Sequence, residues 1–302
     1  MRRMKKNKNP KYIAAAALLA VAVFITAFSR GVFGERLQRF FNPAAAFDTS
    51  VDFMKITDVG QADSILIYSD GCSAVIDVGT QDSVPDIIED LDSARIKDID
   101  ALIVTHLHTD HAGGLPELAK RREIDNLIIP ELDNSAEAAQ LVKTAKRTVT
   151  TNGGNVYTAV QGMNFEIGEF TVTVLAYYGD MQDENNKSVI VMAEIDGIKF
   201  LFTGDAEAKT EKALLDEGLN VDCDVLKVGH HGSSSSCSQS FLKAATPEYA
   251  AISVGENNIY SHPNDSVISA LQNCGAQILR TDTDGDITFY VENGEIRTVT
   301  EK

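Results

Sequence analysis

Three of the six histidines in this 302-residue chain fall within residues 106–111, a segment that reads His-Leu-His-Thr-Asp-His. Residues two apart on an extended chain point the same way, so His106 and His108 can share one cation. A turn after them would direct Asp110 and His111 to a neighbouring cation. Imidazole suits Zn, Fe and Mn, and a carboxylate adds charge compensation. The segment therefore predicts a centre for two divalent metal ions, Zn or Mn, rather than a solvated histidine-rich loop.

An acid and the other three histidines follow further predicted strands. Asp205 comes after the apolar residues 200–202, where it can bridge two cations or, alternatively, cap the helix that follows. His230 and His231 stand between two glycines, so one can bind metal while the other contacts the leaving group. We assign His230 to the metal and His231 to catalysis. His262 precedes a proline and can be a ligand or a proton donor.

Together these residues predict a hydrolytic mechanism. Two cations bridged by Asp205 would make water a strong nucleophile at neutral pH, for attack on phosphorus or on a carbonyl carbon. His231 or His262 would protonate the leaving oxygen as a general acid, and Asp110 would serve both metal binding and catalysis. Three further acids can orient the ligand histidines through hydrogen bonds or serve only as turn and capping residues: Asp58, Asp63 and Asp77.

The periodicity of apolar residues predicts the elements that must hold these side chains. Strands are expected over residues 51–57, 64–68, 74–78, 101–105, 127–130, 224–228 and 249–254, with further strands between 277 and 300. Hairpins are expected over residues 165–178 and 188–203. Helices are expected over residues 85–95, 115–122, 135–148, 206–217, 241–245 and 266–273. Strand-rich segments followed by alternating strands and helices predict an α+β domain, with two mixed sheets between layers of helices.

The N-terminal segment differs in composition from the rest of the chain. Residues 1–40 hold nine Lys or Arg and one acid, whereas the remainder holds 18 Lys or Arg and 43 acids. Residues 1–11 predict a basic cytoplasmic tail, and residues 12–28 a transmembrane helix of roughly 25 Å. Residues 29–50 then form a linker to a domain over 51–302. Basic residues before the span predict a single-pass membrane protein with that domain outside the cell; secretion after signal cleavage is the alternative.

Several stretches resemble the metallo-β-lactamase fold, and most closely the hydrolase-like domain of the competence protein ComEC. They include the segment 106–114 (HLHTDHAGG) and the following further stretches: DVGQADSILI (58–67), VIDVG (75–79), ENNKSVIV (184–191), FTGD (202–205), LKVGHHGS (226–233), SVGENNIYSHP (253–263) and RTDTDGDITF (280–289). The resemblance covers residues 51–290 in order. It implies an αββα sandwich and a metal site that includes the residues assigned above.

Two departures from that resemblance matter. Ala62 stands where ComEC-like domains usually have glycine, and no histidine lies between His111 and Asp205. Many metallo-β-lactamase folds have another ligand histidine there. The segment 185–188 occupies that region, so the first metal is expected to be weakly held, or ligated by Asn186 or water.

The first functional hypothesis is a membrane-anchored extracellular phosphodiesterase. The acidic domain favours a small or cell-envelope phosphodiester, as in the similar teichoic acid phosphorylcholine esterases, over duplex DNA, because nucleic-acid binding usually draws on clustered Lys and Arg. A lactonase or β-lactamase on the same centre is the second hypothesis. A metal-binding scaffold domain without catalysis is the third. The multi-span channel that accompanies this domain in ComEC does not appear in the sequence.

Overall fold

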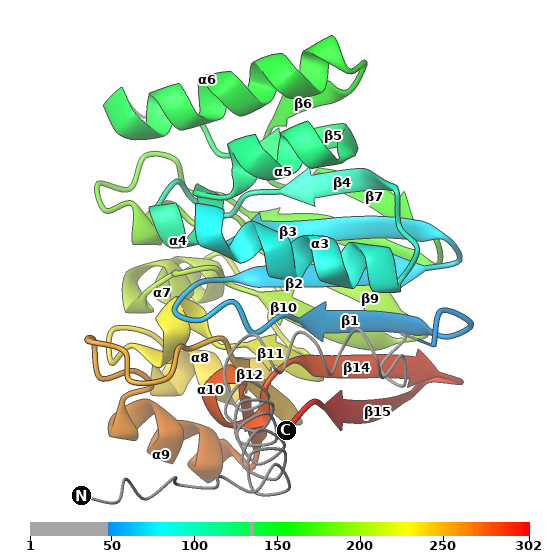
Figure 1. Cartoon of the computed structure of the whole chain (residues 1–302). Helices are drawn as coiled ribbons and strands as arrows, with labels where there is room; N and C mark the ends of the chain where they lie inside the picture. The colour runs from blue at the N-terminus through cyan, green and yellow to red at the C-terminus, as the bar shows by residue number, and fades with distance from the viewer. Residues whose placement is uncertain (1–47, 133–135) are drawn as a thin grey trace, which may run out of the picture. The chain divides into compact units, whose positions relative to one another are not determined.

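Two mixed β-sheets face each other in the computed structural model, which describes residues 48–132 and 136–302 (Figure 1). The larger sheet has the order β15-β14-β1-β2-β3-β4-β5-β6. Its strands are β1 (Asp52–Ile56), β2 (Ser64–Ser69), β3 (Cys72–Val78), β4 (Asp98–Ile103), β5 (Glu123–Ile129), β6 (Asn155–Thr158), β14 (Ile287–Glu292) and β15 (Glu295–Thr300). The smaller sheet has the order β13-β12-β11-β10-β9-β8-β7. Its strands are β7 (Asn164–Ile167), β8 (Phe170–Ala176), β9 (Ile190–Ile195), β10 (Ile198–Phe202), β11 (Val225–Lys227), β12 (Tyr249–Ile252) and β13 (Gln277–Arg280).

The inner faces of the two sheets share one apolar core. Residues of β2 and β3 such as Ile67 and Ile76 belong to the same buried cluster as Phe170, Phe200 and Phe202 of the smaller sheet. Side chains alternate across each strand, so this face is continuous although the segments are far apart in sequence. Burial of this apolar area is what holds the two sheets together.

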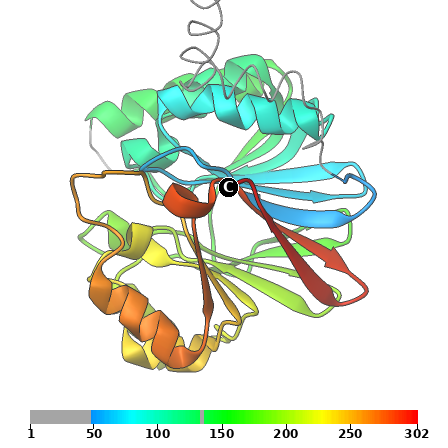
Figure 2. The ribbon, with the colours of Figure 1, turned by 60° about the horizontal axis from the view of Figure 1, so that its bottom comes forward.

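Helices cover the outer faces, which gives the helix–sheet–sheet–helix layering visible in Figure 2. The longer helices are α3 (Val84–Ser93), α5 (Leu115–Arg121), α6 (Ala136–Thr151), α7 (Ala208–Asp216), α8 (Gln239–Ala245) and α9 (Asp265–Cys274), and the short ones are α4 (Thr109–Ala112) and α10 (Thr281–Asp284). Three of them, α7, α8 and α9, bury apolar residues such as Leu214, Phe241 and Leu271 against the smaller sheet.

Parallel strands in both sheets bring the chemistry-bearing loops to one end. In the larger sheet β3, β4, β5 and β6 run parallel, and in the smaller sheet β10, β11, β12 and β13 do. The carboxyl ends of parallel strands meet at one edge of a sheet, which is where open α/β sheets place their sites. The loops after β3, β4, β10, β11 and β12 therefore carry the predicted site residues.

Most of the predicted elements are present, and the expectation of two mixed sheets with helices is confirmed. The strand β6 and the one-turn helix α10 were not predicted. The predicted N-terminal tail, transmembrane helix and nearly all of the linker lie outside the described residues. Among the residues that are described, no helix combines the length and hydropathy needed to cross a membrane.

Candidate metal centre

The carboxylate of Asp205 is the meeting point of four histidines. It is only 2% exposed. Its Oδ1 lies 3.1 Å from Nε2 of His111 and 3.8 Å from Nε2 of His231. Its Oδ2 lies 3.9 Å from Nε2 of His106 and 3.7 Å from Nε2 of His230. Each carboxylate oxygen thus faces two imidazoles, the arrangement expected of an acid that bridges two cations.

The backbone around Asp205 is shaped for this position. Gly204 has a positive φ of 51°, and a Cβ there would meet Oγ1 of Thr105 at 2.8 Å. The amide N–H of Asp205 donates to Oγ of Ser188 at 3.0 Å. Helix α7 takes Glu207 as its N-cap, so the alternative reading of Asp205 as a helix cap is wrong.

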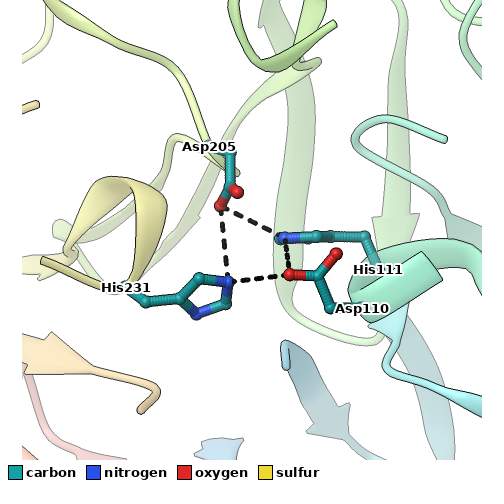
Figure 3. A group of neighbouring side chains, drawn as sticks. All are labelled: Asp110, His111, Asp205 and His231. Atoms are coloured by element: carbon teal, nitrogen blue, oxygen red, sulfur yellow. Dashed lines mark hydrogen bonds and ion pairs between the residues drawn. The ribbon is translucent and has the colours of Figure 1, made fainter. Parts of the chain in front are cut away.

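Three groups of described side chains have ligand atoms close enough to hold a metal ion, and two of them share Asp205. We call the first of these two site A; it consists of His106, His108 and Asp205. We call the second site B; it consists of Asp110, His111, Asp205 and His231 (Figure 3). The third group lies behind site B and consists of Asp63, Asp77 and His111. In each group the ligand atoms all lie within 4.8 Å of one another.

The donor set fits divalent metal ions. Nε2 of His111 and Oδ1 of Asp205 are both buried and lie 3.1 Å apart, yet they are not aligned for a hydrogen bond with each other or with any other described group. Buried polar atoms are nearly always partnered, so an unpartnered pair aimed at one point calls for a cation there. Imidazole nitrogen and carboxylate oxygen suit Zn, Mn and Fe.

In the absence of metal, the acids around site B favour protonation of its histidines. Burial opposes protonation of His111, but the charges of Asp205 and Asp77 outweigh it and hold the pKa of His111 well above its usual range. Burial also opposes protonation of His231, but Asp205 and Asp63 raise its pKa. Metal binding at site B must therefore displace protons, so the affinity for metal rises with pH.

The same charges shift the pKa values of His106, Asp110 and Asp205. Burial and the positive charge of His111 lower the pKa of His106 well below its usual range. Burial alone would raise the pKa of Asp110, but a hydrogen bond from His231 and the charge of His111 lower it to about 2. The pKa of Asp205 is likewise held well below its usual range, because His111 and His231 outweigh its burial. The carboxylates are thus ionised and ready to bind metal.

Asp77 orients His111 through the imidazole nitrogen that does not face Asp205. Its Oδ2 lies 2.7 Å from Nδ1 of His111, and it accepts hydrogen bonds from the backbone N–H and the hydroxyl of Thr105. Asp77 is fully buried and has a left-handed backbone with φ 59°. This contact matches the prediction that an acid orients a ligand histidine, and it leaves Nε2 of His111 for the metal.

Asp63 supports site B from a second side, while Asp58 does not. Oδ1 of Asp63 lies 3.4 Å from Nδ1 of His231. The ammonium of Lys227, itself 1% exposed, donates to Oδ2 of Asp63 at 2.7 Å. Asp58 instead contacts Lys302, away from the histidines. Lys227 was missed from the sequence, although a lone lysine at the end of an apolar strand was a signal of a buried partner.

The two histidines that follow β11 have different surroundings. His231, assigned to catalysis from the sequence, lies within site B, with Nε2 3.3 Å from Oδ2 of Asp110 and Nδ1 3.0 Å from the carbonyl of Ser253. His230, assigned to the metal, belongs to neither compact group. Both residues have left-handed backbones, with φ 51° and 52°, so neighbouring side chains leave the strand end in different directions.

Two other predicted residues take different places. His262 stands at the rim, with its ring centroid 5.7 Å from that of His230, and it belongs to neither metal group. The expectation that Asn186 ligates the first metal is wrong, because its side chain is 3% exposed and occupied by hydrogen bonds. It accepts from the N–H of Glu207 and from Thr210, and it donates to Glu207.

A sequence model of the Metallo-beta-lactamase superfamily matches residues 57–256. The chain belongs to this superfamily. ComE operon protein 3 of Bacillus subtilis (strain 168) is 34% identical over 208 residues, 68% of this chain and 26% of that protein. Competence protein ComA of Neisseria gonorrhoeae is 29% identical over 244 residues, 80% of this chain and 33% of that protein. The chain therefore spans a third or less of the length of these relatives.

Solved structures share the metallo-beta-lactamase fold at low sequence identity. YhfI of Bacillus subtilis, a metallo-beta-lactamase fold protein, gives a TM-score of 0.52 at 14% identity, over 82% of this chain and all of that one. The diiron β-hydroxylase CmlA of Streptomyces venezuelae gives 0.53 at 15% identity, over 80% of this chain and 54% of that one. At these identities the likeness establishes the fold alone.

We predict that Asp77→Asn weakens metal binding about 10- to 100-fold, the usual cost of losing an outer partner of a ligand histidine. Asparagine has the same shape and tolerates a left-handed backbone, so the fold should survive. Isothermal titration with Zn²⁺ measures the effect. Asp58→Asn is the matched control and should bind like the wild type; equal affinities for all three proteins would contradict the role given to Asp77.

Proposed function

We propose that this member of the superfamily is a dinuclear metal-dependent phosphodiesterase. One observation carries the proposal: each oxygen of the buried Asp205 carboxylate faces a different ligand group. When bound, two divalent ions supply a nucleophile from water at neutral pH and neutralise charge that develops on a phosphoryl group. Their site would be held by His106, His108 and Asp205 on one side and by Asp110, His111 and His231 on the other.

His262 is the residue best situated to contact the substrate. Burial lowers the pKa of its imidazole, and the neighbouring His230 and His231 add to that effect. An imidazole at this place can be a hydrogen-bond partner or a proton donor for a phosphoryl or leaving-group oxygen. We propose that His262 lies next to the substrate and keeps the catalytic role expected from the sequence.

The surroundings of the centre favour a phosphodiester that carries an organic group over a long polyanion. The side chains of Glu184 and Glu207 lie beside the site, at Leu107 and His230, and the whole domain is acidic. Tyr260 is 62% exposed and its ring stacks on His262, so it offers an aromatic surface at the rim. The competence names of the relatives favour nucleic acid, but the acidic surface would repel duplex DNA at long range. A small or cell-envelope phosphodiester is the substrate class we propose.

Two other activities compete with this proposal. Lactonase or β-lactamase chemistry on the same centre requires only a carbonyl in place of phosphorus. A metal-binding scaffold role without catalysis would use the same buried atoms of site B, so turnover and not metal binding separates it from the phosphodiesterase.

Activity distinguishes these alternatives. The metal-loaded full-length chain, purified in detergent, should hydrolyse bis-p-nitrophenyl phosphate with Zn²⁺ or Mn²⁺, and should leave a lactone and a β-lactam largely unchanged. His108→Ala and Asp110→Ala should each lower turnover by more than roughly 100-fold. Loss of a residue that only hydrogen-bonds to a ligand costs up to about that factor, and these substitutions remove a ligand itself. Asp216→Ala, at an exposed position on α7, is the matched control. Metal-loaded protein that hydrolyses a lactone or nothing at all would refute the phosphodiesterase.

We also propose that residues 12–28 anchor the chain in the membrane with the catalytic domain outside the cell; a secreted form after signal cleavage is the alternative. The support is the apolar run of 17 residues that follows six Lys or Arg. Protease added to intact cells should remove the domain and leave a cell-associated N-terminal fragment. A domain that stays intact until the cells are broken would refute the outside location, and recovery of the domain in the medium would support secretion.

A further inference from the structure

Site A is the less complete of the two groups that share Asp205. It offers His106, His108 and one oxygen of Asp205, whereas site B offers four residues. The chain has no histidine between His111 and Asp205 that could add to it. A third imidazole must come from elsewhere if site A is to match the ligand number of site B.

His230 faces the oxygen of Asp205 that belongs to site A. Its Nε2 lies 3.7 Å from Oδ2, and Nε2 of His106 lies 3.9 Å from the same atom. Two ligand atoms about 2.0–2.1 Å from one tetrahedral ion are roughly 3.4 Å apart. Both imidazoles are therefore close to the separation that a shared ion requires, on the side of the carboxylate away from His111 and His231.

The other nitrogen of His230 already has the partners that a ligand histidine needs. Nδ1 lies 3.4 Å from Oε1 of Glu207 and 3.3 Å from Oγ of Ser235. His111 shows the same pattern, with its Nδ1 on Asp77 and its Nε2 toward Asp205. A carboxylate on one imidazole nitrogen fixes the tautomer and makes the other nitrogen an acceptor. In the metal-free protein Nε2 of His230 lies 3.5 Å from Nδ2 of Asn185, a contact that a metal ion would replace.

Asn186 holds Glu207 in position for this contact. The amide of Asn186 donates to Oε2 of Glu207 at 3.0 Å, while its Oδ1 accepts from the N–H of Glu207. Asn186 is also tied to Thr210 at the start of α7 through both of its oxygens. The segment 185–187, which stands where a ligand histidine was expected, thus supports a ligand instead of supplying one.

We propose that His230 is the third histidine of site A, positioned by Glu207 and Asn186. This inference rests on the two-metal centre proposed above, and concerns how its weaker half is built. His230 lies outside the compact group of site A, so its imidazole has to turn toward the ion on binding. Site A is accordingly the second to fill, and site B the first.

Titration of the metal-free full-length chain with Co²⁺ tests this, because visible absorption of Co²⁺ reports both the number of ions bound and their coordination. The wild type should bind two ions in sequence. His230→Gly suits the left-handed backbone, and should bind the first ion normally and the second at least tenfold more weakly, with a changed spectrum. Glu207→Gln should weaken only the second ion, by about tenfold. Thermal unfolding of the metal-free variants verifies the fold.

His262→Ala is the matched control, since it removes an imidazole that contacts the ring of His230 but lies outside both metal groups. It should bind both ions like the wild type. If His230→Gly also binds both ions like the wild type, or loses the first ion, His230 is not a ligand of site A and the inference is overturned. A wild type that binds only one ion overturns it as well. Two ions bound as predicted, without phosphodiester turnover, would support the inference while refuting the proposed function.

Discussion

Everything at the centre depends on keeping the carboxylate of Asp205 ionised in the interior. A buried charge is costly unless it is paired, and here four imidazoles surround the two oxygens. In the metal-free protein the charge of Asp205 raises the pKa of His111 and of His231, which favours the positively charged imidazoles as its partners. Two cations would compensate that charge more completely, because they also satisfy the buried donor atoms that make no hydrogen bond. Bound metal would therefore stabilise this end of the sandwich.

Two features of the fold bring the imidazoles to the buried carboxylate of Asp205: the shared position of the strand ends and left-handed backbone at three residues. Parallel strands in each sheet send their carboxyl ends to the same place, so residues more than 100 positions apart share one carboxylate. Asp77, His230 and His231 all have left-handed backbones, which non-glycine residues seldom adopt. Such strain persists where the surrounding structure enforces it. At these three residues it directs the side chains toward the centre, whereas a regular strand would place them elsewhere.

The sequence revealed the cluster at residues 106–111, the acid at 205 and the two-sheet fold, because spacing and strand ends are local signals. The place of His231 within site B was not predicted, because the backbone angles that direct two adjacent side chains leave no visible signal in the sequence. Asn186 was one of the alternatives considered for the first metal, because the sequence does not distinguish a polar residue that binds metal from one that supports Glu207. Lys227 and Glu207 act only through partners distant in the chain.

The most direct test of the account is a crystal structure of the protein loaded with Mn²⁺, with anomalous scattering used to locate the ions. The account predicts two peaks roughly 3.5–4 Å apart, each in contact with a different oxygen of Asp205. One would touch His111 and His231, and the other His106 and His108. A single peak, or two peaks of which only one touches Asp205, would contradict the central claim that this carboxylate bridges two metal ions.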